Sequence, residues 1–226
     1  MNDKTLVLNK EVDELELARQ HKLAYLFIKR TFDIFVGLIG ILFLLPLAII
    51  IKIAYMLTGD NAPILFKQAR IGKDGKTIYI YKFRSMVPNA DEELKKLLKI
   101  KKYKEDYTLY KKLSNDPRIT KVGKLIRHAS LDEFPQFINV LKGDMSVIGP
   151  RPYLHREQEE MGEYYKLITT TKPGLSGFWQ VKGRSNTDFK TRLKMDSFYC
   201  NNQGIRFDAE LFIKTFGVVL GMHGAK

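Results

Sequence analysis

Two adjacent carboxylates, Asp132 and Glu133, are the residues of this chain best suited to chemistry, because Arg127 and Arg151 flank them in the sequence. Ser130 and Glu133 have the spacing of a capping box, so the sequence predicts that a helix begins here. A helix N-terminus beside arginines suits a phosphate ester and its metal ion. The alternative is structural, since acidic residues in a first turn commonly stabilise the positive end of a helix.

The two carboxylates are expected to have different tasks. Adjacent residues on a helix point about 100° apart, so Asp132 and Glu133 should not converge on one atom. One carboxylate can attack a phosphorus while its neighbour holds Mg²⁺ against the non-bridging oxygens. Nearby arginines would neutralise the charge of the transferring group.

Four cations are candidates for binding phosphate: Arg127, Arg151, Lys82 and Arg84. Prolines on both sides of Arg151, within residues 149–152, stiffen the backbone and suit bidentate phosphate recognition. An ordinary turn at this point is the alternative. Lys82 and Arg84 directly follow a predicted β element.

The formal net charge of +13 indicates an anionic partner, which could be nucleic acid, an acidic membrane surface or a phosphorylated substrate. Aromatic and cationic residues do not alternate in a nucleic-acid-binding pattern, so we expect no nucleic acid. A single cysteine, Cys200, excludes an internal disulfide. The length of 226 residues, without a composition break, indicates one domain.

The segment from Ile34 to Ile51 has eighteen residues without a charge, close to the length that spans a bilayer. Pro46 should bend this helix, and cations lie on both sides of the segment. Both ends then fit best on the cytoplasmic side of the membrane. We therefore expect a re-entrant helix over residues 29–57, whose charged entry residues lie at the lipid headgroups. A tilted transmembrane helix with a proline kink is the alternative.

The remaining elements predict a mostly helical α/β fold with a small β-hairpin. Two apolar runs flank the Asp74-Gly75 turn of the hairpin. Residues 91–112 read as one long helix whose six lysines between Lys95 and Lys104 either contact anionic lipid or only face solvent. Residues 208–220 predict a last helix with Phe212 and Phe216 on its packed face.

Several ordered motifs together resemble the monotopic phosphoglycosyl transferases, the bacterial sugar transferases that begin exopolysaccharide, capsule, O-antigen and glycan assembly. The resemblance covers nearly all of residues 27–222. Its motifs are Lys29-Arg30-Thr31-Phe32-Asp33, Lys82-Phe83-Arg84-Ser85-Met86, Ser130-Leu131-Asp132-Glu133, the segment 139–146, Gly149-Pro150-Arg151-Pro152 and the segment 172–184.

The resemblance implies transfer of a sugar-1-phosphate from a UDP-sugar to undecaprenyl phosphate by a ping-pong mechanism. Asp132 matches the family's nucleophile and Glu133 its Mg²⁺ ligand, while Arg127 and Arg151 match phosphate-contacting positions. Pro46 matches the break of the re-entrant helix, although Leu45 stands where the family often has serine.

The resemblance further implies a single catalytic domain over residues 1–226, with a leader over residues 1–28, in the bacterial inner membrane and facing the cytoplasm. Its cofactor would be Mg²⁺, and its partners a UDP-sugar, undecaprenyl phosphate, the anionic leaflet and a second copy in a homodimer. Gln180 and Arg184 are candidate nucleotide-sugar contacts, although glycines in segment 172–184 could equally serve turns. The donor sugar is expected to be galactose or glucose, and residues 87–115 to pack near the membrane interface.

Two other interpretations stay open at this point. A membrane-anchored basic module without catalysis would bind its partner with a steep salt dependence and would not need Asp132. A transferase that works only through a ternary complex would never carry a phosphosugar on Asp132.

Overall fold

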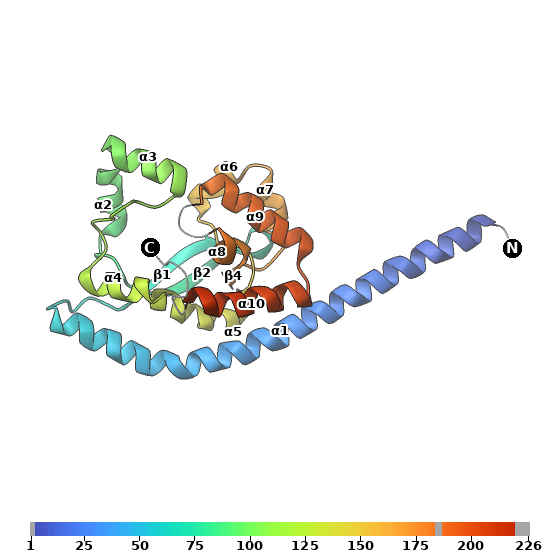
Figure 1. Cartoon of the computed structure of the whole chain (residues 1–226), viewed down its shortest axis with the longest axis horizontal. Helices are drawn as coiled ribbons and strands as arrows, with labels where there is room; N and C mark the ends of the chain where they lie inside the picture. The colour runs from blue at the N-terminus through green and yellow to red at the C-terminus, as the bar shows by residue number, and fades with distance from the viewer. Residues whose placement is uncertain (1–2, 184–186, 220–226) are drawn as a thin grey trace.

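The computed structural model describes the backbone of residues 3–183 and 187–219, and the side chains of residues 20–183 and 187–217. Helices predominate, and the strands form two separate two-stranded sheets (Figure 1). The elements are α1 (Asp3–Leu57), β1 (Leu65–Ile71), η1 (Lys73–Gly75), β2 (Thr77–Phe83), α2 (Ala90–Leu97), α3 (Lys101–Tyr110), α4 (Lys121–His128), η2 (Leu131–Gln136), α5 (Phe137–Lys142), β3 (Ser146–Ile148), η3 (His155–Glu157), α6 (Gln158–Met161), α7 (Tyr164–Ile168), β4 (Gly174–Ser176), α8 (Phe178–Lys182), α9 (Phe189–Asn202) and α10 (Ile205–Val219).

The N-terminal helix α1 is continuous from Asp3 to Leu57, so the leader and the apolar segment form one element. Pro46 lies inside this helix. The helix runs along one side of the globular part, bends in its apolar half and projects beyond the other elements at its N-terminal end (Figure 1). The helix continues through the proline, and the re-entrant helix broken at Pro46 stays a prediction.

Apolar side chains cover the outer surface of α1. The stretch Gln20–Leu57 is long and apolar enough to cross a membrane. Its most exposed large side chains include Phe27, Leu42 and Leu57, which are 75%, 73% and 83% exposed. Because a contiguous apolar surface of this kind is unfavourable in water, it indicates membrane association.

The charged residues at the entry to the apolar segment fasten α1 to the rest of the protein. Lys29 forms an ion pair with Asp208 of α10 at 2.5 Å. Arg30 donates to the carbonyls of Val140 and Leu141 at the end of α5, at 2.6 and 2.7 Å. Asp33, which is 3% exposed, accepts hydrogen bonds from Ser146 and from the Val147 amide at the start of β3. These groups bind protein atoms, whereas the sequence analysis placed them at lipid headgroups.

The predicted hairpin is confirmed. Strands β1 and β2 pair antiparallel, with Leu65 opposite Phe83 and Ile71 opposite Thr77. The turn places Asp74 at φ 56° and Gly75 at φ 74°, which is the left-handed geometry that an Asp-Gly pair favours. A second, parallel pair, β3 and β4, was not predicted.

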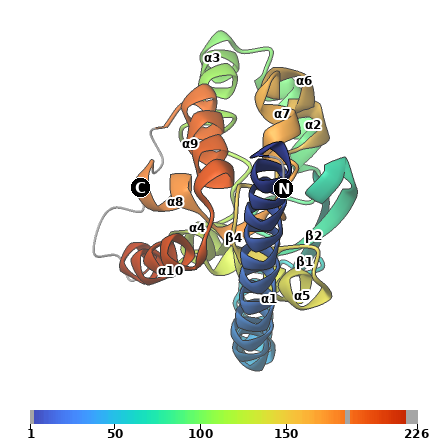
Figure 2. The same ribbon diagram turned by 90° about the vertical axis from the view of Figure 1, so that its right-hand side faces the viewer.

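The predicted long helix over 91–112 is wrong, because the segment forms two helices, α2 and α3. Ile100 between them is extended, at φ −89° and ψ 124°. The break lets Leu94 become buried, while the six lysines of the segment stay exposed to solvent. Both helices lie on the side of the globular part opposite α1, and their expected position near the membrane interface stays a prediction (Figures 1 and 2).

The hydrophobic core joins the hairpin to the C-terminal helices. Its fully buried members include Ile80 of β2, Val140 of α5, Tyr199 of α9 and Leu211 of α10. The predicted last helix is confirmed as α10, which begins three residues before the expected Asp208. Phe212 of α10 packs edge to face on Phe32 of α1, with ring centroids 4.8 Å apart. This core fixes β2, which in turn supports η2.

Candidate active site

Asp132 and Glu133 lie on η2, a 3₁₀ turn between α4 and α5 that packs on β2. The predicted capping box is wrong. Ser130 adopts a left-handed conformation, at φ 55°, and its side chain makes no capping hydrogen bond. Pro135 has no amide hydrogen to donate, and the regular helix α5 begins only at Phe137. The N-terminus of that helix therefore does not coincide with the carboxylates.

Lys82 of β2 organises the carboxylate pair. Its ammonium donates to Glu133 Oε1 at 2.6 Å. Asp132 and Glu133 line different cavities, so the expectation that they do not converge is confirmed. Glu133 is therefore tied to the hairpin, while Asp132 stays directed into the polar cavity described next.

We call this polar cavity the basic cavity; it measures about 370 Å³. Five of the six polar candidates that the sequence analysis placed around the phosphate line it, and the sixth, Glu133, does not; the five are Lys82, Arg84, Arg127, Asp132 and Arg151. Lys82 and Arg84 come from the end of β2, whereas Arg127 comes from α4, whose first turn is capped by Thr120. Arg151 follows β3 in a loop. Three separate segments thus supply cations around Asp132.

The cations of this cavity differ in how they are paired. Arg84 is 8% exposed and forms two 2.9 Å hydrogen bonds to Asp60, and it lies over the ring of Tyr55. Its role in phosphate binding stays a prediction. Among the described residues, Arg127 and Arg151 have no carboxylate within ion-pair distance. These two arginines are therefore free to bind a ligand's charge.

The electrostatic surroundings shift the pKa values of the two carboxylates in opposite directions. Burial raises the pKa of Asp132, and the negative charge of Glu133 raises it further, with Lys82 and Arg127 offsetting only part of the shift. Burial acts to raise the pKa of Glu133, but the ion pair with Lys82 and the charges of Arg151 and Arg70 together outweigh burial and leave that pKa below its usual value. Glu133 is thus the more firmly ionised of the pair.

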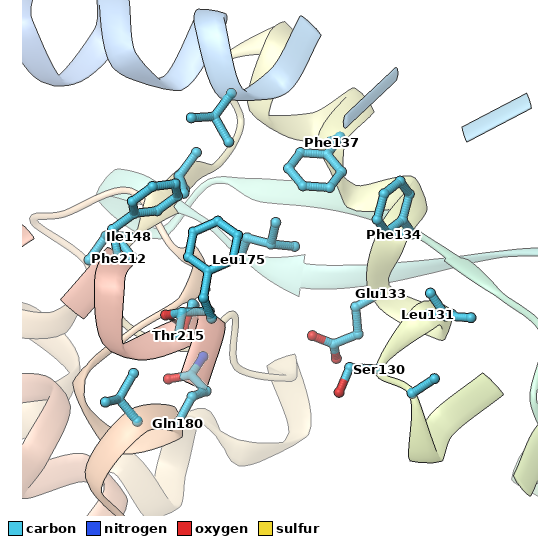
Figure 3. Close-up of a pocket in the computed structure, with 16 residues that line it drawn as sticks. Ser130, Leu131, Glu133, Phe134, Phe137, Ile148, Leu175, Gln180, Phe212 and Thr215 are labelled. Carbon is cyan, nitrogen blue, oxygen red and sulfur yellow. Dashed lines mark hydrogen bonds between the residues drawn. The ribbon is translucent and has the colours of Figure 1, made fainter. Parts of the chain in front are cut away.

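A second cavity, which we call the apolar pocket, lies on the other side of η2 and measures about 330 Å³. Phe134, Phe137 and Phe212 line its side toward α1, and the carboxylate of Glu133 points into it (Figure 3). Gln180 of α8 lies across the pocket from the carboxylate. The predicted contact Gln180 thus lines the apolar pocket, and not the basic cavity.

Two other predicted positions lie elsewhere. Arg184 falls outside the described residues. Pro46 lies on α1 and lines neither the basic cavity nor the apolar pocket.

A family model described as bacterial sugar transferase matches residues 24–222. The chain belongs to the bacterial sugar transferase family. The resemblance inferred from the sequence motifs is therefore confirmed, and this sugar transferase is an enzyme. That result disfavours the alternative of a binding module without catalysis.

Curated relatives of this sugar transferase carry related names. It is 43% identical, over 88% of its length, to an undecaprenyl-phosphate galactose phosphotransferase of Salmonella typhimurium, of which it covers 42%. It is 37% identical, over 83% of its length, to the UDP-glucose:undecaprenyl-phosphate glucose-1-phosphate transferase of Escherichia coli, covering 39% of that protein. It is 33% identical to the exopolysaccharide production protein ExoY of Sinorhizobium fredii, with 87% of each chain covered. The sugar transferase thus spans less than half of the first two relatives and most of the third.

Binding of Mg²⁺ by the carboxylates of the sugar transferase, Asp132 and Glu133, stays a prediction. Within the described residues, no group of three or more His, Cys, Asp or Glu side chains could hold a metal ion alone. Mg²⁺ is commonly held by one or two carboxylates together with substrate phosphates and water. The crowding of Asp132 by Glu133, which raises the pKa of Asp132, is a strain that a divalent cation would relieve.

Two residues of the site were missed by the sequence analysis of the sugar transferase. Asp196 of α9 is fully buried and accepts hydrogen bonds from the Arg151 amide at 3.0 Å and the Tyr153 hydroxyl at 2.7 Å. Burial raises the pKa of Asp196 to about 7. Asp196 thus positions the loop that carries Arg151. Arg70 of β1 lines the basic cavity, although its place within an ordinary strand pattern gave no signal.

Proposed function

We propose that this chain transfers a sugar-1-phosphate from a UDP-sugar to undecaprenyl phosphate, which yields an undecaprenyl-diphosphate-sugar and UMP. The observation that carries the proposal is the placement of Asp132 in a cavity with Arg127 and Arg151, two arginines without carboxylate partners in the described structure. The names of the relatives, which include galactose and glucose transfer, support the same reaction class.

The chemistry proceeds in two steps at Asp132. Its carboxylate oxygen attacks the phosphorus that bears the sugar, an oxygen–phosphorus bond forms, and the bond to the bridging oxygen breaks so that UMP leaves. A phosphate oxygen of the acceptor lipid then attacks the same phosphorus, and the carboxylate departs unchanged. Arg127 and Arg151 stabilise the charge on the transferring phosphoryl group.

The ion pair between Lys82 and Glu133 affects the pKa of the nucleophile, Asp132. The ion pair places the positive charge of Lys82 near Asp132, where it opposes the rise of the Asp132 pKa that burial and the charge of Glu133 cause. Mg²⁺, when bound by Asp132 and Glu133, would add positive charge that neutralises the phosphate oxygens. The chain's own contribution is to fix both carboxylates on one short turn.

The apolar pocket suits the lipid acceptor. It lies beside α1 and α10 and is lined mainly by apolar side chains, with Glu133 at its polar side (Figure 3). A polyprenyl chain that enters from the bilayer could therefore bring its phosphate to η2, while the polar donor occupies the basic cavity on the other side. Support for this arrangement is that η2 contributes residues to both cavities.

We also propose that α1 enters and leaves the inner membrane on its cytoplasmic face. The bend of α1 in its apolar half supports this geometry (Figure 1). So do the cations on both sides of the apolar segment, because positively charged flanks favour the cytoplasmic side. The enzyme would then act in the first membrane step of polysaccharide assembly.

The proposal is tested by UMP release across a panel of UDP-sugars, with undecaprenyl phosphate and Mg²⁺ present. With Asp132→Asn, turnover should fall by roughly 10³-fold or more, because the nucleophile is gone. Asp132 of the unmodified protein should acquire a labelled phosphosugar when the acceptor is left out. Removal of Mg²⁺ with a chelator should abolish turnover.

The matched control is Asp144→Asn, which removes one carboxylate from a turn outside both cavities and should keep activity. If no UDP-sugar yields UMP, the proposed reaction is wrong. If UMP appears only when the acceptor is present and no label reaches Asp132, a ternary-complex mechanism replaces the two-step one.

A further inference from the structure

The cations of the basic cavity fall into two groups according to their partners. Eight arginine and lysine residues line it. Four of them form ion pairs with carboxylates at 2.9 Å or less. These pairs are Lys82–Glu133, Arg84–Asp60, Lys111–Glu160 and Arg118–Asp116. Arg156 is 3.9 Å from Asp91. The other three cations, Arg70, Arg127 and Arg151, have no carboxylate within ion-pair distance among the described residues.

Arg70 is the unusual member of the second group, because it is only 6% exposed. Its Nε and Nη2 atoms both donate to Gln68 Oε1, at 3.1 and 2.5 Å, and its Nη1 donates to the Pro152 carbonyl at 3.0 Å. A guanidinium has five N–H donors, so two remain. A buried charge without an ionic partner is costly, which makes this arrangement informative.

Gln68 orients Arg70 without neutralising it. A carboxylate in the same position would hold the guanidinium equally well and would cancel its charge, whereas the neutral amide leaves the charge available. Burial, together with the positive charge of Arg151, lowers the pKa of Arg70 to about 10. The protein thus holds a buried cation in a fixed orientation, and an additional anion bound beside it would lower the electrostatic cost of burying that charge.

Arg70 and Asp132 line the same cavity from different elements, β1 and η2. The charges acting most strongly on Asp132 are those of Glu133, Lys82 and Arg127. The charges acting most strongly on Arg70 are those of Arg151, Glu157 and Glu133. The basic cavity therefore holds a cation of β1 in addition to the cations near the nucleophile.

We propose that Arg70, held by Gln68 and assisted by Arg151, binds the phosphate that stays with the nucleoside when the donor is cleaved. This inference rests on the proposed function and names the subsite of the leaving group. When Asp132 attacks the sugar-bearing phosphorus, the electron pair of the broken bond moves to the bridging oxygen, which departs with UMP. The negative charge thus grows where Arg70 can bind it through charge-assisted hydrogen bonds.

The test measures the dissociation constant of UMP with the full chain carrying Asp132→Asn, so that no turnover interferes. Adding Arg70→Gln should weaken UMP binding by about tenfold or more, since charge-assisted hydrogen bonds are lost. Lys111→Met is the matched control, because it also removes one positive charge from the cavity lining. The charge that it removes is already neutralised by an ion pair with Glu160. That control should change UMP affinity by less than about twofold.

A second variant tests the same inference without removing Arg70, in case Arg70→Gln does not fold. Gln68→Glu has the same shape and can accept the same hydrogen bonds, but it supplies the charge that would neutralise Arg70. It should also weaken UMP binding while the thermal unfolding midpoint stays unchanged or rises.

The outcomes separate this inference from the proposed function. If both Arg70→Gln and Gln68→Glu bind UMP as tightly as the Asp132→Asn parent, the inference is overturned, even when the unmodified enzyme releases UMP and labels Asp132. If the unmodified enzyme neither releases UMP nor binds it, both proposals fail.

Discussion

At the scale of single residues, Lys82 decides how negative charge is distributed in the site. Its ammonium lies 2.6 Å from Glu133 and lowers the pKa of both carboxylates of η2. Asp132 nevertheless keeps a raised pKa, because burial and its acidic neighbour outweigh the cations. A nucleophilic carboxylate must be deprotonated, so the rate of transfer should fall as the pH drops through the pKa of Asp132.

Replacing Lys82 should therefore shift the acid limb of the pH–rate profile, the range in which the rate falls as the pH drops. In Lys82→Met the cation that lowers the pKa of Asp132 and Glu133 is gone, so both pKa values rise and activity is lost at a higher pH than in the unmodified enzyme. The measurement is kcat/KM for UMP release as a function of pH. Lys82→Arg keeps the charge and should leave the acid limb near its original position. An acid limb that does not move in Lys82→Met would contradict the assigned electrostatics.

At the scale of elements, α1 and α5 pack so closely that only glycine fits between them. A Cβ atom on Gly40 would lie 2.3 Å from the ring of Phe137, and one on Gly37 would lie 2.7 Å from Leu141. Phe137 directly follows η2. Helix α1 therefore packs against the residue that follows the turn carrying the carboxylates, and it also contacts η2 directly.

We expect Gly40→Ala to destabilise the protein and lower its activity. Overpacking costs about 1–3 kcal/mol, more than the roughly 1 kcal/mol that alanine gains over glycine in a helix. The measurement is the thermal unfolding midpoint in detergent, together with UMP release. Gly217→Ala in α10 is the control, because its Cβ would meet nothing within 4 Å, so it should be neutral or stabilising. Equal midpoints for the two variants would show that the contact with Phe137 yields easily.

At the scale of the whole molecule, the path of α1 sets where the catalytic cavities lie relative to lipid. The globular part sits on one side of this helix, with α3 at the far end of the globular part (Figures 1 and 2). Both cavities could face the cytoplasm, with the apolar pocket toward the bilayer. This arrangement requires that α1 return to the face from which it entered.

Labelling of single cysteines added at either end of the chain tests this topology. In the unmodified sequence, a membrane-impermeant maleimide should reach both ends from the cytoplasmic side. Pro46→Ala restores the missing amide hydrogen and should straighten α1, so the N-terminal end should become reachable from the opposite side. The native Cys200 is 7% exposed, and burial raises the pKa of its thiol to about 12, so background labelling should be low. Ends on opposite sides in the unmodified sequence would mean a simple span.

The sequence by itself determined the features that depend on local pattern or on ordered motifs. The Asp74-Gly75 pair fixed the hairpin turn because few other residues adopt its left-handed geometry. The uncharged segment Ile34–Ile51 determined the apolar part of α1, which is long and apolar enough to cross a membrane. Several ordered motifs together indicated the family, and the structure gathers the candidate cations around Asp132.

Only the tertiary structure decided which side chains pair. Glu133 could have capped its own turn, but Lys82, fifty-one positions earlier in the chain, binds it instead. The roles of Arg84 and Arg70 were set in the same way, because one meets Asp60 and the other meets only Gln68 and a carbonyl. Ion pairs between distant segments depend on how β1, β2 and η2 pack, and that packing leaves no periodic signal in the sequence.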